Sequence, residues 1–329
     1  MITIIYGYFC LVSDVPEHFF NQNLHSENQW VQNDLLQKKE ISLCIKREDQ
    51  IHPEVSGNKF RKLKYNLLEA KKKGFDVILT FGGAYSNHIL ATAVAARMMG
   101  LESVGVIRGE ELKEHLKATL EANKTLGKAV ENGMKLDFIS RSAYREKDDA
   151  EFLKTLQKKF GNFYLIPEGG TNDLAVSGCE EILTEEDAQF DYICTCVGTG
   201  GTIAGLINAS GNHQKVLGFP ALKGEFLVEE VSRYVGRKSN WQLVTDYHFG
   251  GYAKYNLDLI RFINDFNKNF KIPLDPIYTG KMLYGIFDMI NKDVFAKGSQ
   301  ILVIHSGGLQ GIDGFNQRLE RKQEEIRIE

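Results

Sequence analysis

The sequence predicts an α/β protein built from parallel sheets with helices on both faces. Short apolar segments alternate with longer segments of helical periodicity, and glycine-rich turns follow several of the apolar segments. The apolar segments are continuous, as in strands that are covered on both faces. A chain of 329 residues has room for two such three-layer domains, at about 100–200 residues each.

The predicted strands are short and rich in apolar residues. In chain order they are residues 41–49, 76–81, 103–108, 163–167, 192–197, 216–220 and 301–305. The first predicted helix, residues 59–73, has an apolar face and is followed by Gly74, which is well placed to end it. The second, residues 86–99, is closed by Gly100.

Composition disfavours several classes of partner. With a net charge of −3 and a pI near 6.3, the chain has no basic field to hold nucleic acid or an anionic membrane. The apolar run 2–12 is too short to span a bilayer and no basic residue precedes it. We interpret this run as a strand or an extension, with a signal peptide as the alternative. The five cysteines show neither a disulfide framework nor zinc-ligand spacing. We therefore expect no metal site, and we expect a cytoplasmic location.

The segment SGNKFRKL, residues 56–63, leads into the first predicted helix and places Lys59 in its first turn. Most lysines are solvated, and Arg61, Lys62 and Lys64 are predicted to form a solvated helix face. A lysine that forms a Schiff base needs a partly neutral amine, which desolvation, nearby cations and the positive end of a helix favour. Lys59 is therefore a candidate catalytic lysine, although the segment alone is a weak signal.

The segment FGGAYSNH, residues 81–88, joins a predicted strand to a helix. A serine at this place is more often a helix N-cap than a catalyst. The loop nevertheless follows the carboxyl end of a parallel strand, where open α/β sheets bind ligands. Ser86 is thus a candidate for acting on a substrate proton and Asn87 for bonding a phenolate oxygen, while His88 is expected to be structural.

The segment VGTGGTIAGL, residues 197–206, combines a glycine-rich turn with the start of a helix, which is a phosphate site. It lacks the lysine of an ATP-binding loop, and Ile203 stands where a dinucleotide motif has its last glycine. The turn therefore predicts a single phosphate monoester, and the alternative is a tight packing turn. The candidate phosphate-binding residues are Gly198, Thr199, Gly200, Gly201 and Thr202.

The segment VIHSGGLQG, residues 303–311, is a further strand followed by a Ser-Gly-Gly turn. Ser306 is a candidate partner for a ring nitrogen, and capping is the alternative. A neutral hydroxyl would not keep that nitrogen protonated, which favours elimination and replacement over transamination.

The order of these four segments resembles the fold-type-II pyridoxal-5′-phosphate (PLP) enzymes, which share the tryptophan synthase β-like fold. The match narrows to the 1-aminocyclopropane-1-carboxylate (ACC) deaminase and D-cysteine desulfhydrase family. It extends from about Ile41 to Gly308. The segments that carry the narrower match are KRED at 46–49, IPEGGTN at 166–172, GGYAKYN at 250–256 and DPIYTGKMLYG at 275–285.

The resemblance implies that Lys59 binds PLP, that Ser86 is catalytic and that Asn87 contacts the phenolate oxygen. It implies that the turn 198–202 holds the phosphate and that Tyr252 and Tyr278 line the substrate pocket. For the two tyrosines, the alternative is a half-buried hydroxyl that satisfies a neighbour. We assign residues 55–160 to a smaller domain and residues 1–54 with 161–329 to a larger one. By resemblance we also expect a homodimer.

Two departures from the family bear on the substrate. Thr279 stands where ACC deaminases carry glutamate, and Tyr85 stands where both branches usually show glutamine. Thr279 favours β-elimination of D-cysteine to pyruvate, sulfide and ammonia over ring opening of ACC to 2-oxobutanoate and ammonia. The base would be Lys59, or Ser86 assisted by Tyr278. Three rival functions compete with this one: a serine/threonine dehydratase or sulfhydrylase, a non-catalytic PLP-binding protein and a nucleotide-binding domain.

Overall fold

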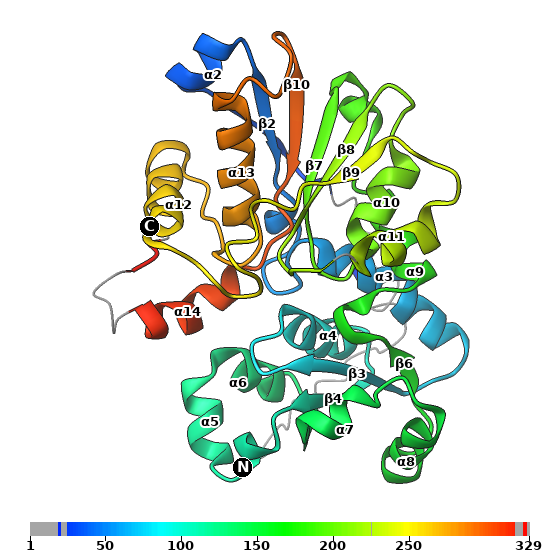
Figure 1. Ribbon diagram of the computed structural model, residues 1–329. Coiled ribbons are helices and arrows are strands. Elements are labelled where there is room, and N and C mark those ends of the chain that lie inside the picture. Colours follow the sequence, from blue (N-terminus) through cyan, green and yellow to red (C-terminus); the bar gives the residue numbers. More distant parts are fainter. Residues whose placement is uncertain (1–18, 21–24, 225, 320–324, 328–329) are drawn as a thin grey trace, which may run out of the picture.

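Two separate sheets divide the strands between them, one above the other in Figure 1. The computed structural model describes residues 19–20, 25–224, 226–319 and 325–327. Within these residues, the six-stranded sheet has the order β1-β2-β10-β7-β8-β9 and the four-stranded sheet the order β5-β4-β3-β6. Every neighbouring pair is parallel except β1 and β2, which are antiparallel.

The strands of the six-stranded sheet come from both ends of the described chain. They are β1 (Asn28–Val31), β2 (Ser42–Lys46), β7 (Tyr192–Val197), β8 (Lys215–Pro220), β9 (Trp241–Leu243) and β10 (Gln300–Ile304). The four-stranded sheet is formed by the part of the chain between β2 and β7. Its strands are β3 (Val77–Gly83), β4 (Glu102–Arg108), β5 (Met134–Ile139) and β6 (Tyr164–Ile166).

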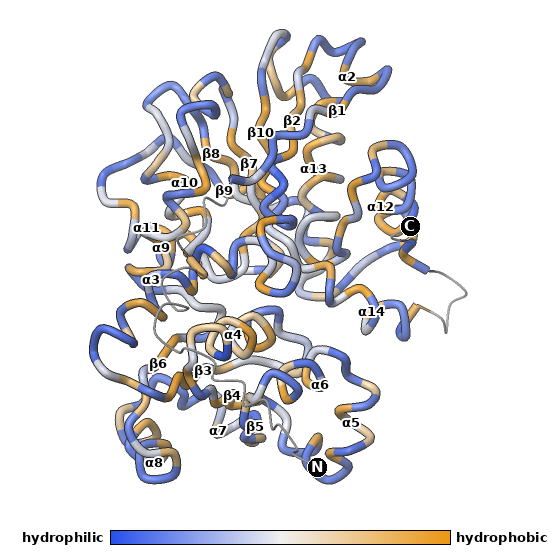
Figure 2. The backbone as a smooth tube through the Cα atoms, turned by 180° about the vertical axis from the view of Figure 1, so that it is seen from behind, coloured by the Kyte–Doolittle hydropathy of each residue, from blue (hydrophilic) through white to orange (hydrophobic). Residues whose placement is uncertain are grey.

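The helices cover both faces of each sheet. Around the four-stranded sheet lie α3 (Asn58–Lys72), α4 (Asn87–Met98), α5 (Leu116–Ala122), α6 (Lys124–Glu131), α7 (Arg141–Arg145) and α8 (Ala150–Phe160). Around the six-stranded sheet lie α2 (Asp34–Lys39), α9 (Asp173–Glu180), α10 (Gly201–Ala209), α11 (Phe226–Val235), α12 (Leu257–Phe270), α13 (Thr279–Asn291) and α14 (Ile312–Leu319). Figure 2 shows hydrophobic segments on the inner strands and on α4.

Alternation along the strands explains the three layers. In β10, Ile301 and Val303 pack against α12, α13 and α14, whereas Leu302 and Ile304 join the core formed with α9, α10 and α11. Successive side chains of a strand point to opposite faces, so an unbroken apolar strand supplies two cores at once. The predicted three-layer α/β architecture is therefore confirmed. Cys194 and Cys196 share one core, since residues two apart on a strand point to the same face.

Two details differ from the predicted organisation. Strand β1 was not predicted and is antiparallel, so the six-stranded sheet is mixed at this edge. Strand β6 pairs with β3 in the four-stranded sheet, although residues 161–329 are assigned above to the larger domain. The strand propensity of residues 164–166 does not specify which sheet they join, because pairing is decided by a partner about 86 residues earlier. We propose that the smaller domain extends through β6.

Several further predictions bear on the chain termini and on location. The apolar run 2–12 and Cys10 lie outside the described residues. The other four cysteines are free and buried. None of the helices in the described ranges combines the length and the apolar character that a bilayer crossing requires.

Candidate active site

The predicted site segments meet where the carboxyl ends of the strands face the start of α3. The FGGAYSNH loop follows β3, the GTGGT turn follows β7 and the HSGG turn follows β10. A Cβ on Gly57 would lie 1.9 Å from the carbonyl oxygen of Ser306, and the amide of Asn58 donates to the same oxygen at 3.2 Å. Gly57 also has φ of +63°, so only glycine allows the SGNK segment to pack onto the HSGG turn.

Lys59 lies beside the glycine turn. Its Nζ donates to Asn58 Oδ1 at 3.2 Å, and Asn58 Nδ2 donates to Thr202 Oγ1 at 2.8 Å. Burial lowers the pKa of Lys59 below its ordinary value, because a desolvated ammonium is costly. The amine is therefore biased toward the neutral form that an attack on a carbonyl carbon requires.

Lys62 is a site residue that the sequence reasoning missed. The prediction of a solvated face for Arg61 and Lys62 is wrong, since both side chains are buried, Lys62 with 2% of its surface exposed. Lys62 Nζ donates to Gly169 O at 3.1 Å, to Thr171 Oγ1 at 2.9 Å and to Thr199 Oγ1 at 3.2 Å. Its spacing of three from Lys59 places both on one helix face, which is the signal that could have found it.

The charge of Lys62 reinforces the electrostatics of the turn. Burial, and then the neighbouring charge of Lys59, lower the pKa of Lys62 to about 7. Arg61 is paired instead with Glu48 at 2.9 Å and faces away from this cluster of cations. A bound anion would supply the counter-charge that Lys62 lacks. It would favour the protonated amine, so Lys62 would take up a proton when the anion binds.

The GTGGT turn has the form of an anion cradle. Gly200 has φ of +86° and caps α10, whose first amides have no partner within the helix. Thr199 Oγ1 lies 2.6 Å from Thr171 Oγ1, and a Cβ on Gly201 would lie 2.8 Å from the same atom. Amides at a helix N-terminus, two threonine hydroxyls and Lys62 together form a donor set for a phosphate.

Ser86 and Asn87 carry uncommitted polar groups. Ser86 is the N-cap residue of α4 by position, with φ of −75° and ψ of 118°, but its side chain makes no cap hydrogen bond. Asn87 Oδ1 is buried and has no hydrogen-bond partner in the described part of the chain. A buried amide without a partner is costly, and the amide can present either its oxygen or its NH₂ group at this place. His88 is buried and its Nε2 lies 2.8 Å from Thr80 Oγ1, and the structural role expected for it stays a prediction.

Tyr252 and Tyr278 lie together above the glycine turn. Their ring centroids are 6.3 Å apart in an edge-on arrangement, and a Cβ on Gly198 would lie 3.5 Å from the Tyr278 ring. Burial raises the pKa of Tyr278 well above its ordinary value, so its hydroxyl stays protonated. Tyr252 is 46% exposed and therefore stands at the solvent side of the pair.

Two residues that were not predicted hold these tyrosines in place. Asp275 accepts the backbone amides of Ile277 and Tyr278, each at 2.9 Å, and so fixes the start of α13. Lys281 donates to the carbonyl oxygens of His248 at 2.9 Å and Gly251 at 2.8 Å, which anchors the loop that carries Tyr252.

We expect Lys281→Met to speed hydrogen exchange of the backbone amides in residues 248–254, because the loop loses both anchors. Burial lowers the pKa of Lys281 to about 8, so wild-type exchange, corrected for its intrinsic pH dependence, should also rise above that pH as the ammonium loses charge. Lys292→Met is the control, since exposed Lys292 at the end of the same helix pairs with Asp288 at 2.6 Å. Unchanged exchange in Lys281→Met would show that the loop holds itself.

Ser306 is buried, and its Oγ lies 3.0 Å from Cys196 Sγ. A hydroxyl can donate and accept at the same time, so the thiol contact leaves Ser306 able to bond a ring nitrogen as well. Ser306 lies in the turn that follows β10, beside the SGNK segment that carries Lys59.

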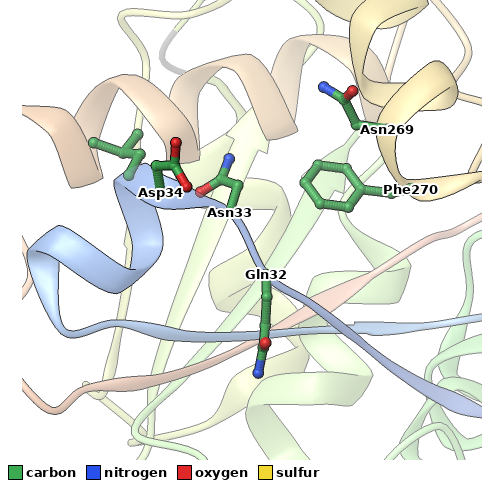
Figure 3. A pocket seen from close by; sticks show the side chains of 6 residues that line it. Gln32, Asn33, Asp34, Asn269 and Phe270 are labelled. Carbon is green, nitrogen blue, oxygen red and sulfur yellow. The ribbon is translucent and has the colours of Figure 1, made fainter.

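A separate hollow lies away from these residues. Figure 3 shows it between Gln32, Asn33 and Asp34 and the end of α12 at Asn269 and Phe270. Because β1 is antiparallel to β2, this hollow lies at the amino end of β2, opposite the glycine turns. It contains none of the predicted site residues.

A family model for pyridoxal-phosphate dependent enzymes matches residues 31–307. The chain belongs to this family. The predicted cofactor is thereby confirmed as pyridoxal phosphate, and the chain is a PLP-dependent enzyme.

Relatives place this PLP-dependent enzyme more closely. It is 33% identical over 298 residues to a Pyrococcus horikoshii protein provisionally named ACC deaminase, covering 84% of this chain and 87% of that protein. It is 31% identical to the bifunctional D-cysteine desulfhydrase/ACC deaminase of Arabidopsis thaliana, covering 82% and 73%. The crystal structure of an ACC deaminase homologue matches with a TM-score of 0.75 at 29% identity, covering 90% and 93%. The predicted family and the fold-type-II architecture are confirmed.

The residues present fit the cofactor. Pyridoxal phosphate carries a phosphate monoester, a phenolate oxygen, a ring nitrogen and an aldehyde. The donor set around the GTGGT turn suits the phosphate. The side-chain amide of Asn87, whose buried Oδ1 has no partner among the described residues, suits the phenolate oxygen. Ser306 and the desolvated amine of Lys59 are available for the other two. These individual assignments are proposals.

Proposed function

We propose that this enzyme catalyses β-elimination of D-cysteine, with water, to pyruvate, ammonia and sulfide. The Cα–H and Cβ–S bonds break, the sulfur leaves with the electron pair of its bond, and water later replaces the nitrogen. The proposal is finer than family membership, because the relatives' names include both D-cysteine desulfhydrase and ACC deaminase.

The environment of Thr279 carries the choice of D-cysteine. Its side chain is fully buried, and its Oγ1 donates to Asp275 Oδ1 at 2.8 Å and accepts from the Asp275 amide at 2.9 Å. The Thr279 amide donates to the same carboxylate oxygen at 2.8 Å. The position directly after Tyr278 thus supplies no free acid, and the buried carboxylate of Asp275 is occupied by hydrogen bonds.

The roles of the other residues follow from their positions. When bound, pyridoxal phosphate delocalises the electron pair that remains at Cα after proton removal. Lys59 supplies the amine that holds the aldehyde carbon, and Lys62 with the turn 198–202 holds the phosphate. Ser86 accepts or relays the Cα proton, while the protonated hydroxyls of Tyr278 and Tyr252 donate to the departing group or to the substrate carboxylate.

The direct experiment supplies the holoenzyme with D-cysteine, L-cysteine, D-serine and ACC in parallel and measures pyruvate, 2-oxobutanoate, sulfide and ammonia. We expect equal amounts of pyruvate and sulfide from D-cysteine and little 2-oxobutanoate from ACC. Production of 2-oxobutanoate from ACC without sulfide from D-cysteine would replace elimination by ring opening. The homodimer implied by the resemblance remains a prediction, which light scattering on the same sample tests.

Lys62→Met should weaken binding of the cofactor phosphate by roughly 10- to 100-fold, the value of a charge-assisted hydrogen bond. Pyridoxine 5′-phosphate is the probe, because it lacks the aldehyde and so reports the phosphate contact without the Lys59 linkage. With a pKa of about 7 in the free protein, Lys62 must take up a proton to bind the anion above that pH. Wild-type affinity should therefore fall as pH rises above 7, and this fall should be smaller in Lys62→Met.

Lys64→Met is the matched control for this variant. Lys64 lies two residues further along α3 and pairs with Glu181 at 2.7 Å, away from the glycine turn. Equal losses of affinity in the two variants would attribute the effect to general charge and remove Lys62 from the phosphate site.

A further inference from the structure

The short loop that carries Ser86 lies between two elements that are distant in sequence. On one side Asn123, between α5 and α6, donates Nδ2 to the carbonyl oxygen of Ala84 at 3.0 Å. On the other side the segment 308–314, which follows β10, packs against Tyr85 and Asn87, the two neighbours of Ser86. Ser86 itself makes no cap hydrogen bond that would hold its hydroxyl in place.

Glycines form the surface on which the loop sits. A Cβ on Gly308 would lie 3.3 Å from Asn87 Nδ2, and a Cβ on Gly311 would lie 3.9 Å from Asn87 Oδ1. A Cβ on Gly314 would lie 2.8 Å from Cε1 and 3.0 Å from Cδ1 of Tyr85. Carbon atoms attract best at about 3.5–4.0 Å, so a methyl group at residue 314 would displace the Tyr85 ring from its present position on α14.

Helix α14, on which Tyr85 packs, is held in place by buried residues and by contacts to the segment around Asn123. Helix α14 is fixed to the six-stranded sheet through its buried residues Ile312, Phe315 and Leu319. Asp313 of the same helix pairs with Lys124 at 2.6 Å, and Gln317 donates to the carbonyl oxygen of Ala122 at 3.4 Å. These exposed contacts are individually weak. Tyr85 is 51% exposed, so about half of its surface is withdrawn from water, and its ring packs against Gly314.

We propose that Tyr85 is a positioning residue for Ser86. Its ring, seated on Gly314, fixes the loop 84–87 against α14 and so sets the position of the Ser86 hydroxyl relative to Lys59 and Tyr278. The catalytic consequence rests on the proposed function, whereas the contact itself does not.

Gly314→Ala tests the seat directly. Residue 314 has an ordinary helical backbone, and alanine favours a helix over glycine, so the added methyl acts against the Tyr85 ring alone. We expect faster hydrogen exchange in residues 84–90 and a kcat lower by roughly 10- to 100-fold with a smaller change in KM, since a misplaced catalytic group costs about that much. Tyr85→Ala should give the same result. Tyr85→Phe keeps the ring and should retain most of the turnover and the slow exchange.

The double variant separates the contact from a general disturbance of α14. Once Tyr85 is alanine, Gly314→Ala should change neither exchange nor kcat, and it should raise the melting temperature through helix propensity. Equal effects of Gly314→Ala in both backgrounds, or unchanged exchange in the single variants, would overturn the proposal. So would faster exchange with unchanged kcat in an enzyme whose wild type is active. Exchange needs no substrate, so a wild type inactive on all four substrates would refute the proposed function and leave the contact tested.

Discussion

We expect Lys59→Ala to remove the near-visible absorption of PLP linked to the protein and the covalent fixation of that PLP by borohydride, and to lower turnover below about one-thousandth of wild type. Lys59 is the lysine beside the glycine turn whose amine is predicted to hold the cofactor aldehyde, and it is also a candidate base. Each protein is incubated with PLP and freed of unbound cofactor; a spectrum before and after borohydride, together with the pyruvate assay, then measures both losses.

Two additions sharpen this test. Lys64→Ala, on the same helix but paired with Glu181, should keep the absorption and the turnover. A small primary amine added to Lys59→Ala should restore part of the turnover, because it can take the place of the missing amine in the linkage and in proton transfer. A wild type that shows no such absorption even with added PLP would contradict the assignment of Lys59.

We expect Ser86→Ala to lower kcat by roughly 10²- to 10⁴-fold, the usual contribution of a positioned acid or base, and to leave the cofactor bound. The alternative role of Ser86 as a helix cap predicts a different outcome. Its side chain makes no cap bond, so the free energy of unfolding should change little in Ser86→Ala.

Ser140→Ala is the matched control, because we expect the opposite result from it: lower stability and unchanged kcat. Ser140 caps α7 and its Oγ accepts from the Ala143 amide at 3.1 Å. Its loss should cost about 1 kcal/mol of stability and leave kcat unchanged. If Ser86→Ala instead destabilises the protein and keeps its turnover, Ser86 is a cap and the Cα proton must be handled by Lys59.

The local pattern of the chain predicted the architecture and the cofactor. Unbroken apolar strands such as residues 301–304 specify a sheet covered on both faces, whatever lies far away in sequence. The order of the lysine, serine, glycine-turn and Ser-Gly-Gly segments predicted the family, which the comparisons confirm. The least predictable strand was β6, because three residues pair with whichever sheet edge is near.

The environment of individual side chains depended on distant partners. Lys62 lies in a basic segment of α3, as solvated Lys72 does, yet its three hydrogen-bond partners lie 107 to 137 residues further along the chain. The contact between Tyr85 and Gly314 likewise joins residues that no local pattern relates. Burial and its effect on pKa are properties of the assembled neighbourhood.

By itself the sequence determined that the chain is an α/β protein of covered parallel sheets and that it uses PLP, because periodicity and motif order are properties of neighbouring residues. Only the tertiary structure decided that the amine of Lys62 is buried beside the glycine turn, that Thr279 is hydrogen-bonded to Asp275 and that Tyr85 packs on α14. The physical reason is that desolvation and steric fit arise only when distant segments are brought into contact.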